Sequence, residues 1–374
     1  MRIGVPKEVK IQEYRVAATP DIVRSLVADG HEVFIQSQAG QRSGYTDDMY
    51  LAAGAKIVST AGEIYACDLV VKVKEPQISE VALIREGLVM FCFFHLAAEP
   101  SLAQELIARK CIAISYDTVT DSEGRLPLLY PMSEIAGRVA IQVGATLLQA
   151  NNGGRGILLG GIAGTPRGKV VVIGGGASGT ESVRMALGLG AQVTVIDKNL
   201  FRLRQLDALF PNGLTTLAST PGTVTEALVG ADLVVGAVLL PGKKTPKVVT
   251  RAMLAGMSPG SVIVDIAIDQ GGCCETSRPT THDDPTYVVD GVTHYCVTNM
   301  PGSCPRTASQ ALTNATSEYI RALANKGYCK ALMDDVGLRQ GLNTCGGKIT
   351  NRSVADDLKL AYTPAEELLC SHVT

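Results

Sequence analysis

The chain has 374 residues, which is too long for one compact core and predicts two domains. Hydrophobic residues make up 46% and charged residues 19%, a composition typical of globular α/β enzymes and not of disordered or fibrous chains. The formal net charge of −2 argues against the strongly basic surface that binds nucleic acid, so we expect no nucleic-acid partner.

Cysteine spacing and hydropathy indicate the compartment. The ten cysteines form no CxxC pair and no repeated spacing, so we expect reduced thiols rather than a zinc site or a disulfide framework. The longest apolar run, 88–94, is far shorter than a membrane span, and the first residues form no apolar signal core. The sequence therefore predicts a soluble, cytoplasmic protein without membrane contact.

The first third of the chain alternates β-branched runs with helical stretches, a pattern that predicts a parallel sheet. Thr19 as N-cap and Pro20 at the first helical position begin the first helix, and Gly30 ends it. The expected strands are 2–6, 31–36, 55–58, 68–73, 88–94 and 111–116.

A second alternating unit follows a helical stretch at 132–149 and a glycine-rich connector. Its expected strands are 169–173, 192–197, 231–239 and 261–269. A long helix at about 306–326 then returns the chain to the first domain, and the tail after 327 is expected to form short helices. We predict two Rossmann-like α/β domains with parallel sheets, in which a continuous domain, 129–306, is inserted in a discontinuous one, 1–128 and 307–374.

A dinucleotide-binding turn follows the buried strand 169–173. Gly174 permits a tight turn, Gly176 lets the backbone approach a pyrophosphate, and Gly179 allows close packing of strand and helix. We expect the helix from about Thr180 to Leu189 to face the phosphates with its N-terminus. The next strand ends at Asp197, where a carboxylate can bind both ribose hydroxyls and repel a 2′-phosphate, which favours NAD over NADP.

Four polar residues lie in or beside apolar strands. Lys74, His95 and Asp269 follow the carboxyl ends of expected strands, where ligands collect in parallel sheets, and Arg15 lies in the segment EYRVAATP. Any one of them alone could equally be a surface cation or a satisfied core residue. Together they predict a catalytic site.

Several segments carry a resemblance over nearly the whole chain. The chain resembles the alanine dehydrogenase family, which shares its fold with transhydrogenase alpha subunits. The segments are RVAATP, KVKEP, FFHLAA, LPLLYPMSEIAGR, NNGGRG, VDIAIDQGGCCETSRPTTH and CVTNMPGSCPRTASQALTNAT. The resemblance implies reversible, NAD-dependent deamination of L-alanine to pyruvate and ammonium by a homohexamer.

The resemblance also implies residue roles. Arg15 and Lys74 would hold the substrate carboxylate and carbonyl, His95 would donate and accept the proton, and Asp269 would assist at the reacting carbon. Histidine exchanges protons near neutral pH and a guanidinium matches a carboxylate, but the residues leave open whether His95 or Asp269 is the principal base. The expected cofactor contacts are Ser133, Gly174, Gly176, Ala177, Ser178, Gly179, Asp197, Arg202, Ser219, Val238, Leu239, Ile266, Ala267, Ile268, Asp269, Arg278, Val297, Thr298, Asn299 and Met300.

Two positions depart from the family pattern. The chain has Asp117 in SYDTV where members of the family carry Glu in YETV, and Ala322 and Lys326 stand where an acidic residue and a histidine serve some members as metal ligands. We therefore predict no metal. We also expect no redox role for Cys273 and Cys274, because buried thiols commonly pack as small apolar side chains.

Two other functions stay open at this stage. A transhydrogenase subunit that binds NAD(H) shares RVAATP but lacks the second lysine of KVKEP and the histidine of FHLAA, both of which are present here as Lys74 and His95. A lysine- or saccharopine-type dehydrogenase would need a larger pocket.

Overall fold

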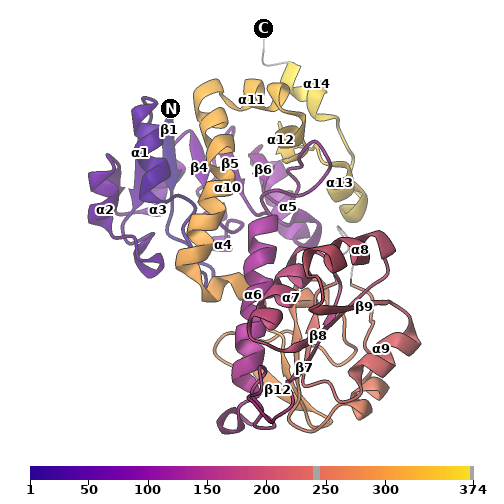
Figure 1. Cartoon of the computed structure of the whole chain (residues 1–374). Coiled ribbons are helices and arrows are strands. Elements are labelled where there is room, and N and C mark those ends of the chain that lie inside the picture. Colours follow the sequence, from indigo (N-terminus) through magenta and orange to yellow (C-terminus); the bar gives the residue numbers. More distant parts are fainter. Residues whose placement is uncertain (239–244, 371–374) are drawn as a thin grey trace. The chain divides into compact units, whose positions relative to one another are not determined.

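The computed structural model describes residues 1–238 and 245–370. They divide into two compact units, one of residues 1–132 with 304–374 and one of residues 133–303. Each unit has its own sheet with helices beside it (Figure 1).

The first unit contains an eight-stranded sheet in the order β15-β14-β6-β5-β4-β1-β2-β3. The strands from β6 to β3 are parallel, whereas β14 and β15 add antiparallel partners at one edge. The strands are β1 (Arg2–Val5), β2 (Glu32–Gln36), β3 (Lys56–Val58), β4 (Leu69–Val71), β5 (Val89–Cys92), β6 (Ile112–Ser115), β14 (Leu342–Cys345) and β15 (Lys348–Ile349).

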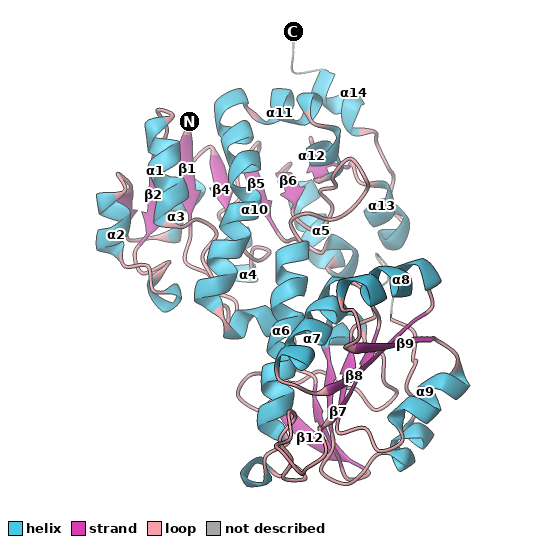
Figure 2. Ribbon diagram, viewed as in Figure 1, coloured by secondary structure: helices cyan, strands magenta, loops and turns pink. Residues whose placement is uncertain are grey.

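Helices connect these strands and form the C-terminal region of the unit (Figure 2). The longest of them, α10 (Pro305–Lys326), packs against α1 and against the short helix η1 (Gln41–Ser43). The others are α1 (Pro20–Ala28), α2 (Asp47–Ala52), α3 (Ala61–Tyr65), α4 (Ile78–Val81), η2 (Leu96–Ala98), α5 (Pro100–Ala108), α11 (Tyr328–Asp334), α12 (Val336–Gln340), α13 (Arg352–Leu358) and α14 (Ala365–Cys370).

The second unit contains a seven-stranded sheet in the order β12-β13-β11-β10-β7-β8-β9, parallel except for the edge strand β12. The strands are β7 (Lys169–Ile173), β8 (Gln192–Asp197), β9 (Leu214–Ala218), β10 (Leu233–Gly236), β11 (Val262–Asp265), β12 (Thr286–Val289) and β13 (Val292–Tyr295). The helices are α6 (Tyr130–Leu147), which begins at the unit boundary, η3 (Ala150–Asn152), α7 (Ala177–Gly188), α8 (Leu200–Leu209), α9 (Pro221–Leu228), η4 (Arg251–Gly256), η5 (Ile266–Gln270) and η6 (Met300–Ser303).

Both sheets have the strand order of a Rossmann fold, in which the first strand lies between the second and the fourth. Their central strands are apolar along their whole length because helices cover both faces of a parallel sheet. Val170, Val171 and Val172 of β7, for example, are fully buried. The predicted fold class, two Rossmann-like domains with mostly parallel sheets, is confirmed.

Some predicted elements were wrong in detail. The tail forms the antiparallel strands β14 and β15 as well as short helices, and the strands β9, β12 and β13 were not predicted. The helix after the glycine turn begins at Ala177, not at Thr180. Among the described residues, none of the helices combines the length and the apolar character needed to cross a bilayer.

Candidate functional site

The strand order of the first unit marks where a ligand would bind. Strands β2 and β4 lie on either side of β1, so the chain leaves β1 and β4 in opposite directions and a crevice forms at their carboxyl ends. The segment that follows β1 carries Arg15, and Lys74 follows β4 by three residues. Both predicted substrate residues therefore lie at the switch point of this sheet.

Arg15 is buried and held by a carboxylate two residues away. Its Nε donates to Glu13 Oε1 at 2.7 Å and its Nη2 to Glu13 Oε2 at 2.5 Å, while Nη1 lies 3.1 Å from Met132 Sδ. Burial by itself would raise the pKa of Glu13, but the Arg15 guanidinium lowers it to about 2. The Nε edge of Arg15 therefore binds Glu13, and this ion pair sets the orientation of the guanidinium.

The RVAATP segment is bound to α10 by hydrogen bonds between residues that are 293 and 296 positions apart in the sequence. The Val16 amide donates to Ser309 Oγ at 2.9 Å, and Thr313 Oγ1 donates to the Ala17 carbonyl at 3.4 Å. Tyr50 donates its hydroxyl to the Ala18 carbonyl at 2.7 Å. These hydrogen bonds satisfy backbone polar groups of Val16, Ala17 and Ala18, whose apolar side chains are buried.

Lys74 is half-buried and forms no hydrogen bond or ion pair with any described residue. Burial lowers the pKa of its ammonium group, and the positive charges of Arg15 and Lys10 lower it further. Because burial and neighbouring positive charges disfavour the charged form of Lys74, a bound anion would stabilise its ammonium group. Lys74 and Arg15 together therefore form a site suited to a carboxylate.

The other lysine of KVKEP has a structural role. Lys72 is completely buried and its Nζ contacts Glu80 Oε1 at 2.8 Å and Glu8 Oε2 at 3.3 Å. Burial opposes its charge, but these two carboxylates raise the pKa of Lys72. Glu8 Oε1 also accepts a hydrogen bond from the Val73 amide at 2.7 Å, which fixes the backbone beside Lys74.

His95 follows β5 and has an exposed side chain. Its backbone is left-handed, with φ of 49°, a conformation that histidine adopts uncommonly and that recurs at functional sites. The Phe93 amide donates to the Val73 carbonyl at 3.0 Å, so the segments that carry His95 and Lys74 are joined by a backbone hydrogen bond. The first unit thus gathers Arg15, Lys74 and His95 at one edge of its sheet.

In the second unit, the glycine turn after β7 fits a dinucleotide. Gly174 has φ of +101° and a Cβ there would lie 2.5 Å from the Ala237 carbonyl oxygen. A Cβ at Gly179 would lie 1.8 Å from the Gly174 oxygen, so only glycine permits this approach of helix to strand. A Cβ at Gly176 would meet nothing within 4 Å, which leaves open space at the N-terminus of α7 for a pyrophosphate.

Asp197 ends β8 beside this turn. Its Oδ2 accepts from the Gly175 amide at 2.7 Å and its Oδ1 from the Asn199 amide at 2.8 Å. Arg202 donates to the Gly175 carbonyl at 2.6 Å and to Thr180 Oγ1 at 2.5 Å. Both predicted cofactor residues therefore brace the glycine turn, a role that the sequence did not indicate.

The remaining predicted cofactor residues lie on segments at the carboxyl ends of the strands or at the start of α6. Ala177 and Ser178 form the first turn of α7, Ser219 follows β9 and Val238 follows β10. Leu239 lies outside the described residues. The others are placed as follows: Ser133 on α6, Ile266, Ala267, Ile268 and Asp269 on η5, Arg278 over the ring of Tyr287, and Val297, Thr298, Asn299 and Met300 after β13.

Asp269 is exposed on η5, directly after β11, and forms no hydrogen bond or ion pair with the described part of the chain. It belongs to the second unit, whereas His95 belongs to the first. The two candidate bases are therefore carried by different units.

Among the described residues, one group of side chains could offer several metal ligands. It consists of Asp265, Cys273 and Cys274, whose ligand atoms lie within 4.8 Å of one another. The Asp265 carboxylate already accepts hydrogen bonds from the Ala267, Cys273 and Cys274 amides and from the Ser277 hydroxyl. The hydrogen bond with Cys274, together with burial, raises the pKa of Cys273 well above its ordinary value. A Cys273 thiol with a raised pKa, beside a carboxylate that already accepts four hydrogen bonds, suits a buried loop anchor better than a metal centre.

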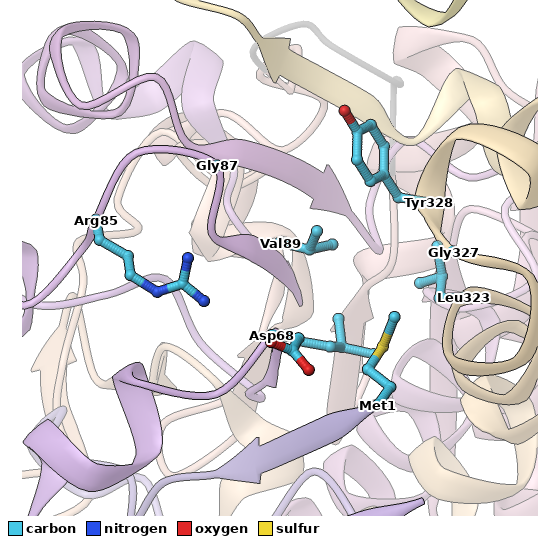
Figure 3. A pocket seen from close by; sticks show the side chains of 9 residues that line it. Met1, Asp68, Arg85, Gly87, Val89, Leu323, Gly327 and Tyr328 are labelled. Atoms are coloured by element: carbon cyan, nitrogen blue, oxygen red, sulfur yellow. The ribbon is translucent and has the colours of Figure 1, made fainter. Parts of the chain in front are cut away.

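A small cavity of about 240 Å³ lies in the first unit, at the opposite edge of the sheet from Lys74 and His95. Figure 3 shows its lining, which comes from residues at the amino ends of β1, β4 and β5 and from the end of α10 and the start of α11, and includes Met1, Asp68 and Tyr328. Ligand sites of open parallel sheets form at carboxyl ends, so we assign this cavity no part in the candidate site.

Sequence reasoning missed two residues of the site. Glu13 pairs with Arg15 and could have been found from the sequence, because it is an acidic residue two positions before that arginine. Asp117 was noted only as a departure from a family pattern, yet its Oδ2 lies 3.7 Å from His95 Nδ1.

Comparison with known proteins bears on both units. The family model described as "Alanine dehydrogenase/PNT, N-terminal domain" matches residues 4–136, and the one described as "Alanine dehydrogenase/PNT, C-terminal domain" matches residues 140–352. The chain is 53% identical to alanine dehydrogenase of Bacillus subtilis, over 99% of this chain and 98% of that one. It is 51% identical to alanine dehydrogenase of Halomonas elongata, over 99% of this chain and 100% of that one.

Solved structures agree with these matches. A structure of L-alanine dehydrogenase superposes with a TM-score of 0.94 at 47% identity, covering 96% of this chain and 99% of that one. A transhydrogenase structure from Sinorhizobium meliloti reaches a TM-score of 0.82 at 23% identity, covering 94% and 100%, which shows a shared fold alone.

Proposed function

The chain belongs to the alanine dehydrogenase/PNT family, and from this premise we propose that it oxidises L-alanine to pyruvate and ammonium with NAD as hydride acceptor. The reaction is reversible. The alternatives, a transhydrogenase subunit and a lysine- or saccharopine-type dehydrogenase, are not favoured, because the relatives at 51–53% identity are named alanine dehydrogenase.

The observation that carries the proposal is the unpaired ammonium of Lys74 beside the buried guanidinium of Arg15. An α-amino acid and its 2-oxo acid share a carboxylate, and two adjacent cations bind such a group. Glu13 holds the Nε edge of Arg15, so this pair sets the orientation in which the guanidinium would meet the carboxylate. Lys74 then also polarises the oxygen that becomes the carbonyl of pyruvate.

The chemistry needs a proton acceptor. Alanine reacts with its amino group neutral, after one proton has left to solvent. The Cα–H bond then breaks, its electron pair leaves as hydride, and an iminium ion remains. Water adds to the iminium carbon while His95 accepts a proton from that water, which gives a carbinolamine. His95 returns this proton to the carbinolamine nitrogen, and the C–N bond breaks as His95 takes the hydroxyl proton, so that ammonia leaves and pyruvate forms. The ammonia takes up that proton as ammonium, and in the reverse direction the same proton transfers run backwards. Asp269 either steadies the positive charge on nitrogen or orients the water.

The second unit would hold the cofactor. The turn formed by Gly174, Gly176 and Gly179 receives the pyrophosphate at the N-terminus of α7, and Asp197 accepts the ribose hydroxyls. NAD, when bound, supplies the acceptor for the hydride. The first unit is accordingly the substrate domain and the second the NAD-binding domain, with the predicted limits of 1–128 with 307–374 and 129–306. We further propose a cytoplasmic homohexamer, which rests on the family resemblance alone.

The test is an assay of NADH formation over a panel of amino acids, with NADP as the second cofactor. L-alanine with NAD should give the highest kcat/KM. A longer amino acid such as lysine turning over faster, or NADP serving equally well, would contradict the proposal.

Two matched substitutions separate substrate binding from folding. Lys74→Met should raise the KM for pyruvate and lower kcat while leaving NADH affinity unchanged, because Lys74 lies in the unit that does not carry the glycine turn. Lys7→Met, at an exposed lysine of the same unit, is the control and should leave both constants unchanged. A Lys74→Met enzyme with native kcat/KM would remove Lys74 from the site.

A further inference from the structure

Asp117 is anchored at the end of β6, beside the end of β5. One of its carboxylate oxygens, Oδ1, accepts from the Phe94 amide at 3.2 Å and from the His95 amide at 3.4 Å. The same oxygen accepts a hydrogen bond from the Ser115 hydroxyl. Three donors on one oxygen fix the position of the carboxylate.

The other carboxylate oxygen of Asp117, Oδ2, lies 3.7 Å from Nδ1 of His95. The imidazole also stacks on the ring of Phe93, with centroids 5.6 Å apart and planes 5° from parallel. The ring is therefore restrained on its Nδ1 edge by a carboxylate and on one face by an aromatic ring. Nε2 is the nitrogen that does not face Asp117.

We propose that Asp117 is a positioning residue that keeps the proton of neutral His95 on Nδ1 and so leaves the lone pair of Nε2 to accept a proton from water. An ionised carboxylate only accepts hydrogen bonds, so it favours the tautomer that presents an N–H to it. The same logic holds in hydrolases where an aspartate selects the histidine tautomer, and loss of that carboxylate there lowers kcat strongly. The separation of 3.7 Å is longer than a hydrogen bond, and catalytic contacts often tighten only when substrate binds.

This inference rests on the proposed function, in which His95 handles the proton. A purely structural alternative also exists, in which Asp117 does no more than accept the two backbone amides. The two differ in what an asparagine would do. The side-chain oxygen of Asn can still accept from Phe94, His95 and Ser115, but its amide hydrogens would then face Nδ1 and force the proton to Nε2.

The first measurement needs no substitution. Histidine labelled with 15N reports its tautomer through the shifts of the two ring nitrogens, and the chain has five histidines, so the His95 signals are assigned by their loss in His95→Asn. In the native enzyme neutral His95 should carry its proton on Nδ1. A native spectrum with the proton on Nε2 overturns the proposal.

The second measurement uses Asp117→Asn, Asp117→Glu and, as matched control, Asp121→Asn, since Asp121 pairs with Arg125 in the following loop. Asp117→Asn should move the proton to Nε2 and lower kcat ~10- to 10²-fold, with NADH affinity and melting temperature nearly unchanged. Asp117→Glu should restore the native tautomer and most of kcat, and Asp121→Asn should behave as the native enzyme.

Two kinetic outcomes would refute the assignment, and they are distinguishable. Native kcat in Asp117→Asn alongside an impaired His95→Asn removes Asp117 from the reaction and leaves the role of His95 intact. Native kcat in both variants means that His95 itself has no role, and both assignments fall.

Discussion

Replacing His95 by asparagine removes the imidazole with little disturbance of the fold. Asparagine suits the left-handed backbone at this position better than alanine, which would be strained at φ of 49°. The side chain of His95 is 43% exposed and the Asp117 carboxylate is 3.7 Å away, so their contact contributes at most about 1 kcal/mol. Loss of the stacking on Phe93 adds a similar amount. The melting temperature should therefore fall by only a few degrees.

The effect on the reaction should be much larger. General acid–base help is worth ~10²- to 10⁴-fold, which corresponds to about 3–5 kcal/mol of activation free energy. Because the residue acts mainly in the transition state, kcat should fall far more than KM rises. The assay compares initial rates of alanine oxidation with NADH binding followed by fluorescence and with thermal melting of the same samples.

The control is His31→Asn, at a histidine of the same unit that contacts the Met1 amino group and Asn325. It should turn over at the native rate. A folded His95→Asn enzyme that keeps most of the alanine oxidation rate would refute the role of His95 and leave Asp269 as the candidate base. A parallel loss of stability, NADH affinity and turnover would instead identify His95 as a packing residue.

Other expectations follow from the same structure. Asp197→Ala should erode the preference for NAD over NADP, mainly by weakening NAD, and equal cofactor selectivity in the native enzyme would contradict this. Gly179→Ala should abolish NADH binding because its Cβ would lie 1.8 Å from the Gly174 oxygen, whereas Gly188→Ala in the same helix meets nothing within 4 Å and should bind normally. Glu13 has a pKa lowered from 4.5 to about 2, so it should contribute about 3 kcal/mol to the free energy of unfolding above pH 4.5, lost as the pH falls toward 2. Urea unfolding of Glu13→Gln should lack that pH dependence. Prolonged dialysis against EDTA should leave turnover intact, and a loss restored by a divalent ion would reveal a metal site.

Local sequence determined the dinucleotide turn and most of the strands. Gly174, Gly176, Gly179 and the strand before them lie close together in the sequence, and the approach that excludes a Cβ at Gly179 is made to Gly174 within the same turn. Gly174 itself approaches the Ala237 carbonyl after β10, a contact that the local sequence does not show. The central strands are continuous apolar runs because both faces of a parallel sheet are covered, which makes them visible without knowledge of their partners. Strands β9 and β12 escaped prediction because they are partly exposed and rich in threonine and tyrosine, so their hydrophobic signal is weak.

Only the tertiary structure decided how the candidate site is held. Val16 meets Ser309 across 293 positions, Lys72 meets Glu8 across 64, and His95 meets Asp117 across 22. A sequence predicts that polar residues at the ends of parallel strands gather at one edge, but it does not say which strand lies next to which. That order is set by the burial of whole sheet faces under helices, which is a property of the complete chain. It places Asp117, which in the sequence is only a departure from a family pattern, next to His95, the candidate base.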